Sequence, residues 1–315
     1  MSGMQATREA YGQVLLELGK EMEDLVVLDA DLSGSTKTAA FGREFPARFF
    51  NFGVAEQGMM GAAAGLAAAG KTPFVSTFAI FAAGRAWEVL RQSVCYPGLN
   101  VKVAASHSGL TVGEDGASHQ ALEDLALTRV LPNLTVLVPA DGVQTRSLVL
   151  AAARTEGPFY IRLGRPKVPF LFEEDTIFEI GKAVSLREGE DVLLVATGPL
   201  LGEALAAAEA LKEEGIGASV LNIHTLKPLD RQAVIETARR TGAVVTVEEH
   251  SVIGGLGSAV SEVLSEEHPV PVIRVGVNDV FGRSGAPDQL LEHYGLKAPY
   301  IVKAAFRAIE AKSRQ

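Results

Sequence analysis

The chain has 315 residues, of which 47% are hydrophobic and 21% charged, and this length is typical of two domains with separate cores. Its formal net charge of −9 and dispersed Lys and Arg residues argue against nucleic acid or a membrane surface as a partner. With a single cysteine, Cys95, it can form no internal disulfide, so the reducing cytoplasm is the expected compartment. No signal-peptide pattern is present, and the most apolar helix-like run, 59–69, is shorter than the ~20 residues that span a bilayer.

Short apolar runs alternate with helix-length segments along the first 170 residues. Each run ends at Gly, Pro or a polar residue, which is typical of strands buried on both faces of a parallel sheet. The runs are 25–29, 101–106, 134–139 and 159–163. They predict an α/β fold with helices on both faces of the sheet.

The alternation stops at 164–180, where two prolines and an acidic pair interrupt it, and it resumes at 191. We therefore predict two three-layer α/β/α domains. The first spans residues 1–170, a linker covers 171–188, and a smaller domain spans 189–315.

Glu56 is expected where a strand at 49–53 turns into a helix made almost entirely of Ala, Gly and Met. Such small side chains allow close packing, so we expect this helix in a core or an interface. A glutamate at a helix start is favoured by the helix dipole. On spacing alone, this structural role is favoured over a catalytic one.

The segment 49–70, FFNFGVAEQGMMGAAAGLAAAG, resembles the pyrimidine-binding domain of the thiamine-diphosphate enzymes. The resemblance implies that Glu56 hydrogen-bonds the ring nitrogen of the cofactor's aminopyrimidine. A carboxyl group there favours the imino form of the exocyclic amine, which then acts as the base that activates the thiazolium carbon. The resemblance also implies a cofactor-site aspartate at Asp31.

Phe78 and Phe81 are three residues apart, which would place them on one side of a helical turn. Core packing is the ordinary role of such a pair. The resemblance implies an aromatic face on which the pyrimidine stacks, with Phe81 the closer match. The family often has a tyrosine where this chain has Gly84, so a smaller aromatic pocket is expected.

The stretch 106–141 begins SHSGLTVGEDGASHQ. Its glycines at 109, 113 and 116 predict a loop folded tightly toward a ligand, with a helix starting near Ala121. Its possible metal ligands match no closed zinc pattern, so no metal site is predicted. These are His107, Glu114, Asp115 and His119.

This stretch closely resembles transketolase, and the resemblance implies substrate-binding roles. His107 would line the channel near the donor phosphate, Asp115 would contact a sugar hydroxyl, and His119 would contact the oxygen of the transferred ketol and act in catalysis. Arg162, in FYIRLGRP, would hold the sugar phosphate, since a guanidinium forks onto phosphate oxygens. Ser35 would contact the same phosphate, although Ser after a strand is also a common turn or cap residue.

In the second half, ATGP (196–199) and IGGLGS (253–258) each follow a strand-like run. Neither completes a dinucleotide-binding G-x-G-x-x-G motif. The run 244–259 resembles the transketolase C-terminal domain, so an assembly role is expected there.

The Gly-Asp-Gly motif that binds the diphosphate and its metal in this superfamily does not occur in the chain. The expected partner is therefore an N-terminal transketolase subunit, in an α2β2 heterotetramer, that binds the diphosphate and Mg²⁺. The implied reaction is transfer of a two-carbon ketol unit between sugar phosphates in the pentose phosphate pathway.

Three alternatives remain at this point. They are the β subunit of a 2-oxo-acid dehydrogenase, a fragment of deoxyxylulose-phosphate synthase, and a non-catalytic homologue. The GEDGASHQ string argues against the first, because that enzyme binds no sugar phosphate. The LPNLTVLVPAD continuation favours transketolase over the second.

Overall fold

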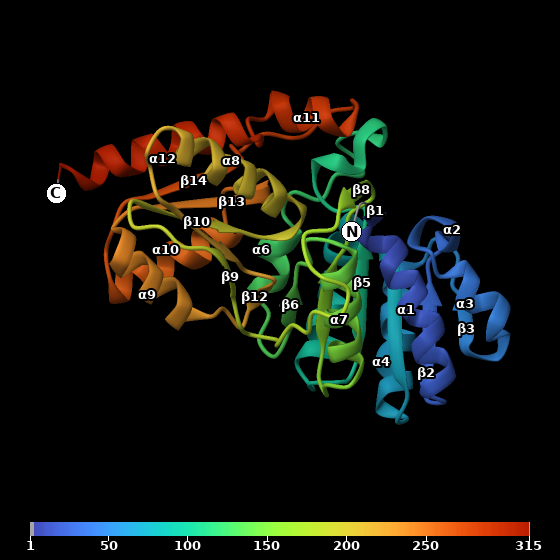
Figure 1. The fold of residues 1–315 in the computed structure, drawn as a ribbon. Coiled ribbons are helices and arrows are strands. Elements are labelled where there is room, and N and C mark those ends of the chain that lie inside the picture. The colour runs from blue at the N-terminus through green and yellow to red at the C-terminus, as the bar shows by residue number, and fades with distance from the viewer. Residues whose placement is uncertain (1–2, 315) are drawn as a thin grey trace.

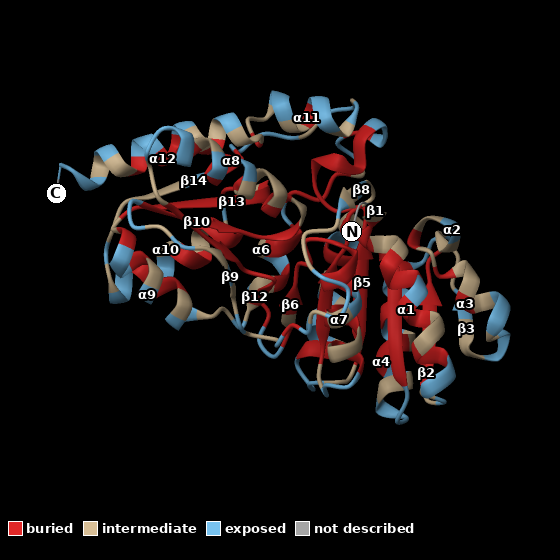
Figure 2. Cartoon of the chain, viewed as in Figure 1, coloured by how far each residue is buried: buried red, intermediate tan, exposed pale blue. Residues whose placement is uncertain are grey.

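The computed structural model describes residues 3–314 and contains two large β-sheets, each covered by helices (Figure 1). The prediction of an α/β chain with two layered halves is confirmed. The central strands of both sheets are buried, while edge strands such as β3 (Phe49–Asn51) and β9 (Val184–Arg187) and the outer faces of the helices are partly exposed (Figure 2).

The first sheet has seven strands in the order β12-β6-β7-β5-β4-β2-β3. Six run parallel: β2 (Leu25–Asp29), β3 (Phe49–Asn51), β4 (Thr72–Phe78), β5 (Lys102–Ser106), β6 (Thr135–Leu137) and β7 (Phe159–Arg162). Every residue of β2, β4, β5 and β7 is buried. These strands are mainly apolar because both faces of the sheet are covered.

Alternate residues of these strands serve two different cores. Leu25 and Val27 pack with α1 (Thr7–Glu21) and α7 (Gly142–Ala153). Val26 and Leu28 pack instead with α4 (Glu56–Ala68) and two π-helical segments, Phe81–Arg85 and Leu90–Cys95. The remaining helices of this half are α2 (Ser33–Thr36), α3 (Ala39–Glu44), α5 (Trp87–Val89) and α6 (Asp124–Arg129), with 3₁₀ turns at Pro46–Arg48 and Leu110–Asp115.

The second sheet has the order β14-β13-β10-β11-β9. Its strands are β9 (Val184–Arg187), β10 (Val192–Ala196), β11 (Ala218–Asn222), β13 (Val244–Ser251) and β14 (Val272–Val277). Its helices are α8 (Leu201–Glu213), α9 (Arg231–Thr241), α10 (Leu256–Glu267), α11 (Pro287–His293) and α12 (Ala298–Lys312), and a 3₁₀ turn at Gly198–Leu200 precedes α8. β9 lies in the predicted linker, 171–188, and is an antiparallel edge strand of this sheet.

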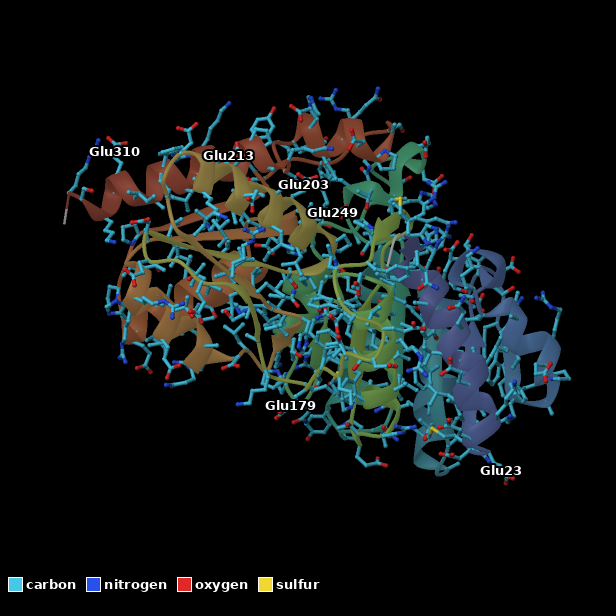
Figure 3. All side chains as sticks on the ribbon, viewed as in Figure 1. Glu23, Glu179, Glu203, Glu213, Glu249 and Glu310 are labelled. Atoms are coloured by element: carbon cyan, nitrogen blue, oxygen red, sulfur yellow. The ribbon has the colours of Figure 1, made fainter. Side chains whose placement is uncertain are left out.

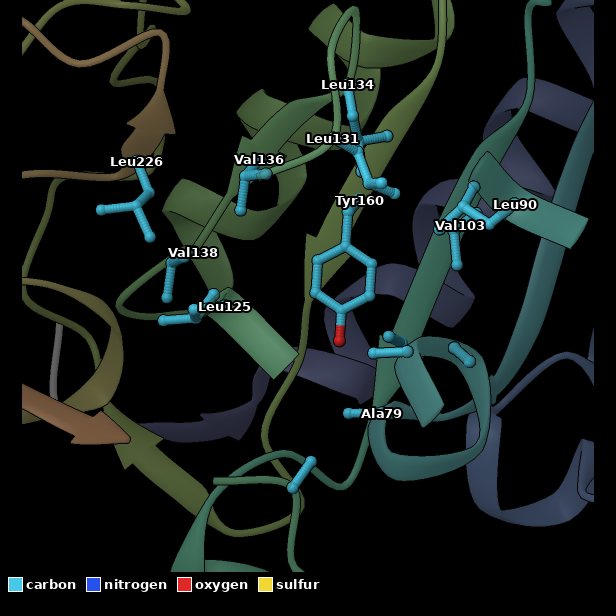
Figure 4. Close-up of a cluster of buried hydrophobic side chains, with 14 of the residues drawn as sticks. Ala79, Leu90, Val103, Leu125, Leu131, Leu134, Val136, Val138, Tyr160 and Leu226 are labelled. Atoms are coloured by element: carbon cyan, nitrogen blue, oxygen red, sulfur yellow. The ribbon is translucent and has the colours of Figure 1, made fainter. Parts of the chain in front are cut away.

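One strand of the second half belongs to the sheet of the first half. β12 (Thr225–Lys227) belongs to the predicted second domain in sequence, yet it pairs antiparallel with β6 of the first sheet. Figure 4 shows Leu226 of β12 beside Val136 and Val138, and one buried apolar cluster contains side chains from both halves.

At the other end, β1 (Met4–Ala6) pairs antiparallel with β8 (Lys167–Pro169). This pairing brings the start of α1 beside the segment that follows β7.

Some local predictions need correction. The helix expected near Ala121 begins at Asp124. Phe78 is the last residue of β4 rather than part of a helical turn, and Phe81 begins a π-helical segment. The helix expected at Glu56 does begin there. Among helices within residues 3–314, none is both long and apolar enough to cross a membrane.

Candidate functional site

Four neighbouring parallel strands end at one edge of the first sheet: β2, β4, β5 and β7. Ligand sites of open α/β sheets form at this carboxyl edge. Most of the predicted site residues end these strands or lie in the segments that follow them. They are Asp31, Ser35, Phe78, Phe81, His107, Asp115 and His119.

Two phenylalanines and two histidines form one ring cluster at this edge. The Phe78 ring stacks on His107 with centroids 3.8 Å apart, and on Phe81 with centroids 5.9 Å apart. His119 presents its ring at a steep angle to Phe81, at 5.6 Å. The structure therefore brings together the residues predicted separately for cofactor and substrate.

Glu56 joins this cluster through Arg85. The Glu56 side chain is buried at the start of α4, and its Oε1 accepts a hydrogen bond from Arg85 Nη1 at 3.0 Å. The Arg85 guanidinium also lies 4.3 Å from the centroid of the Phe81 ring, a cation–π distance. A cavity of about 360 Å³ opens beside Glu56 and Arg85.

His107 is held as a neutral ring in one tautomer. Burial, with the nearby cations Arg8 and Arg165, lowers the pKa of His107 to about 3. Arg8 Nη1 lies 3.1 Å from His107 Nε2 and can only donate, so Nε2 is the acceptor. His107 Nδ1 then carries the proton and donates to Ser106 Oγ at 2.9 Å.

Arg8 and Arg165 also lie beside His107 at this edge, and the sequence pattern did not single them out. Burial and the charge of Arg165 lower the pKa of Arg8, while Arg165 itself pairs with Glu114 at 3.2 Å. Arg8 Nη1 also donates to the carbonyl of Ser35 at 2.9 Å. Two guanidinium groups beside the neutral His107 ring could bind an oxyanion through bidentate hydrogen bonds. Arg165 stands three residues after Arg162 in the string already singled out, but no local pattern points to Arg8.

The predicted acidic residues occupy different positions. Asp115 is partly exposed, and its Oδ2 lies 3.8 Å from Arg165 Nη1. Asp31 is exposed, and its Oδ1 accepts from Asn51 Nδ2 at 3.3 Å. Buried Asp29 anchors the segment that follows β2, because its carboxylate accepts hydrogen bonds from the hydroxyls of Thr36 and Thr38.

The structure contradicts the prediction that Arg162 holds a sugar phosphate. Arg162 is only 4% exposed, and its guanidinium donates to both carboxylate oxygens of Asp124, at 2.8 and 3.0 Å. Burial alone would raise the pKa of Asp124, but the Arg162 charge outweighs it and holds that pKa below its ordinary value. Arg162 is thus a buried structural cation, and Arg165 is the arginine at the open edge.

Known proteins resemble the whole chain. Residues 3–170 match the family model of the transketolase pyrimidine-binding domain, and residues 181–301 match that of the transketolase C-terminal domain. A chain of Methanocaldococcus jannaschii named as a transketolase C-terminal section is 52% identical over 94% of both chains. A 6-deoxy-6-sulfo-D-fructose transketolase subunit of a Clostridium species is 46% identical, over 97% of this chain and 95% of that one.

A solved structure is also similar throughout. It is described as a split-gene transketolase in the form of an inactive β4 tetramer, and it is 59% identical with a TM-score of 0.91 over 98% of this chain and 100% of that one. By contrast, the chain spans only 48% of the length of the rat and human transketolases that it matches.

Proposed function

Because this chain belongs to the transketolase family, we propose that it is the C-terminal subunit of a split transketolase and acts only in complex with an N-terminal subunit. The reaction is reversible transfer of a two-carbon ketol unit from a ketose phosphate to an aldose phosphate. The observation that carries the proposal is the meeting of Glu56, the Phe78 and Phe81 rings, His107 and His119 at one sheet edge. The 2-oxo-acid dehydrogenase and deoxyxylulose-phosphate synthase alternatives are not favoured by the family matches.

The residues present fit a thiamine pyrimidine. A buried carboxylate borders a cavity, and the Phe81 ring lies against Arg85, which lines the same cavity. Glu56 would hydrogen-bond the ring nitrogen and Phe81 would stack against the ring, with Phe78 behind it and Asp31 near the cofactor. When bound, thiamine diphosphate supplies the nucleophilic carbon for ketol transfer.

Arg8 and Arg165 form the anion-binding end of the proposed site. With His107 and Ser35 they would bind the donor phosphate, because guanidinium groups fork onto tetrahedral oxyanions. The name of the Clostridium relative suggests a sulfonate as a second possible anion. His119 would contact the oxygen of the transferred ketol, and Asp115 a sugar hydroxyl.

The partner would supply the diphosphate and Mg²⁺ sites, since this sequence has no Gly-Asp-Gly motif. The similar solved structure is described as an inactive β4 tetramer. This description supports the proposal that activity requires the partner subunit. We propose an α2β2 assembly in the cytoplasm that serves the pentose phosphate pathway.

The test is ketol transfer from xylulose 5-phosphate to ribose 5-phosphate with thiamine diphosphate and Mg²⁺. The chain is measured alone and with the N-terminal transketolase subunit of its own source. Activity in the mixture only would support the proposal. Activity of the chain alone would contradict the partner requirement, and pyruvate decarboxylation without ketol transfer would contradict the reaction.

A further inference from the structure

The loop that carries Asp115 and His119 is packed against the second half of the chain. Its three glycines have positive φ angles of 76°, 86° and 74°. A Cβ at Gly109 would overlap the Glu249 carboxylate, and one at Gly116 would collide with Ser284. The sequence pattern predicted glycines that let the loop approach a ligand, whereas two of them let it approach the C-terminal domain.

Two side chains connect this loop to the C-terminal domain. Glu249 Oε1 accepts a hydrogen bond from the backbone N–H of Thr111 at 2.7 Å. Gln120 Nε2 donates to the carbonyl of Leu110 and to that of Arg283, both at 2.9 Å. Both ends of the turn that contains Asp115 are therefore attached to the second half.

Glu249 is positioned firmly for this contact. It lies on β13 where the two halves meet, while Glu213 and Glu310 lie on outer helices (Figure 3). Glu249 is 4% exposed, and its own carbonyl accepts from Arg162 Nη2 at 3.0 Å. Burial raises the pKa of Glu249, yet either protonation state keeps an oxygen that accepts the Thr111 bond.

Backbone hydrogen bonds within the loop connect its anchored ends to Asp115 and His119. Residues 110–115 form 3₁₀ turns, the N–H of Gly116 bonds to Gly113, and the N–H of His119 bonds to Gly116. Thr111 is buried, so loss of Glu249 removes the hydrogen-bond partner of a buried N–H group. Loss of the Glu249 side chain would therefore alter the positions of Asp115 and His119, the two predicted substrate contacts on this loop.

Resting on the proposed function, we propose that Glu249 is a positioning residue for the reaction, and that the C-terminal domain holds the substrate loop, residues 109–120, in its binding conformation. Glu249 does not touch substrate in this role. It orders Asp115 and His119 before the sugar arrives, so that binding does not have to order them.

The experiment compares Glu249→Ala with Glu249→Gln, which keeps an accepting oxygen. The matched control is Glu262→Ala, which removes another contact between the halves, with Arg129, at an exposed position away from the loop. Hydrogen–deuterium exchange of residues 109–120 is measured in the full chain. Donor KM and kcat are measured in the complex with the N-terminal subunit.

Glu249→Ala is expected to raise amide exchange in the loop at least tenfold and to raise donor KM at least tenfold, with a smaller change in kcat. Glu249→Gln and Glu262→Ala should stay close to wild type. Unchanged loop exchange in Glu249→Ala would overturn the proposal, and so would faster exchange with unchanged kinetics.

If Glu249→Ala does not fold, Gln120→Met removes the other connection at similar volume and is judged by the same two readouts. An inactive wild-type complex would refute the proposed function instead, because loop exchange in the full chain does not depend on activity.

Discussion

Arg85 ties the predicted catalytic carboxylate to the predicted stacking ring: its guanidinium bonds Glu56 Oε1 at 3.0 Å and lies 4.3 Å from the Phe81 ring centroid. Only the Glu56 side of this pair is buried, since the Arg85 side chain is 53% exposed. The pair therefore sits at the boundary between the protein interior and the site opening.

A double-mutant cycle tests this pair in the isolated chain. Arg85→Ala, Glu56→Gln and the double variant are unfolded in urea, and the coupling free energy should be about 1 kcal/mol, as for half-exposed ion pairs. Arg85→Lys should retain part of it, because Lys keeps the charge but not the fork. A coupling within error of zero would contradict a stabilising pair.

Glu56→Gln should abolish ketol transfer while leaving the complex assembled. The amide cannot share a proton with the cofactor ring as a carboxyl can, and general acid–base groups contribute about 10²- to 10⁴-fold in rate. Activity is measured in the complex and assembly by size-exclusion chromatography. Glu310→Gln, on the outer helix α12, is the control. Near-normal rates would remove Glu56 from the mechanism.

Arg165→Leu should raise KM for a phosphorylated donor and spare an unphosphorylated one such as hydroxypyruvate. A hydrogen bond to a charged group contributes about 1.5–3 kcal/mol, which corresponds to roughly 10- to 150-fold in KM. Arg146→Leu, an exposed arginine on α7, should leave both donors unaffected. An equal loss with both donors would contradict phosphate recognition.

Arg162→Met should act on stability rather than on phosphate binding. It leaves Asp124 buried without its cation, and breaking such a buried pair costs about 3–5 kcal/mol. Urea unfolding of the isolated chain measures this loss. A stable variant with a defect limited to phosphorylated donors would instead restore the phosphate role predicted from sequence.

Buried histidines should make the chain less stable in acid. Burial lowers the pKa of His224 from 6.5 to about 4. Between these values the unfolded chain binds a proton at this ring that the folded chain does not, so stability falls as pH is lowered from about 6.5 to 4.

His224→Gln should flatten this slope by up to about 1.4 kcal/mol per pH unit. Urea unfolding at several pH values provides the measurement, with His268→Gln as a control at a half-buried position. An unaltered slope would show that His224 does not titrate in this window.

The sequence by itself determined the features that depend on neighbouring residues. Apolar runs predicted the parallel strands, and the Ala- and Gly-rich segment predicted a helix beginning at Glu56, as observed. The string around Asp115 and His119 indicated a site loop, because its spacing is local.

Only the tertiary structure decided which side chains face one another across long separations in the chain. Arg8 and Arg165 meet because β1 pairs with β8, and no periodic pattern records that pairing. The sequence predicted Arg162 as the phosphate ligand, but in the structure Arg162 forms a buried ion pair with Asp124, which lies on another element. β12 joins the first sheet for a similar reason, since an edge strand is chosen by the surface available for pairing and not by its own residues.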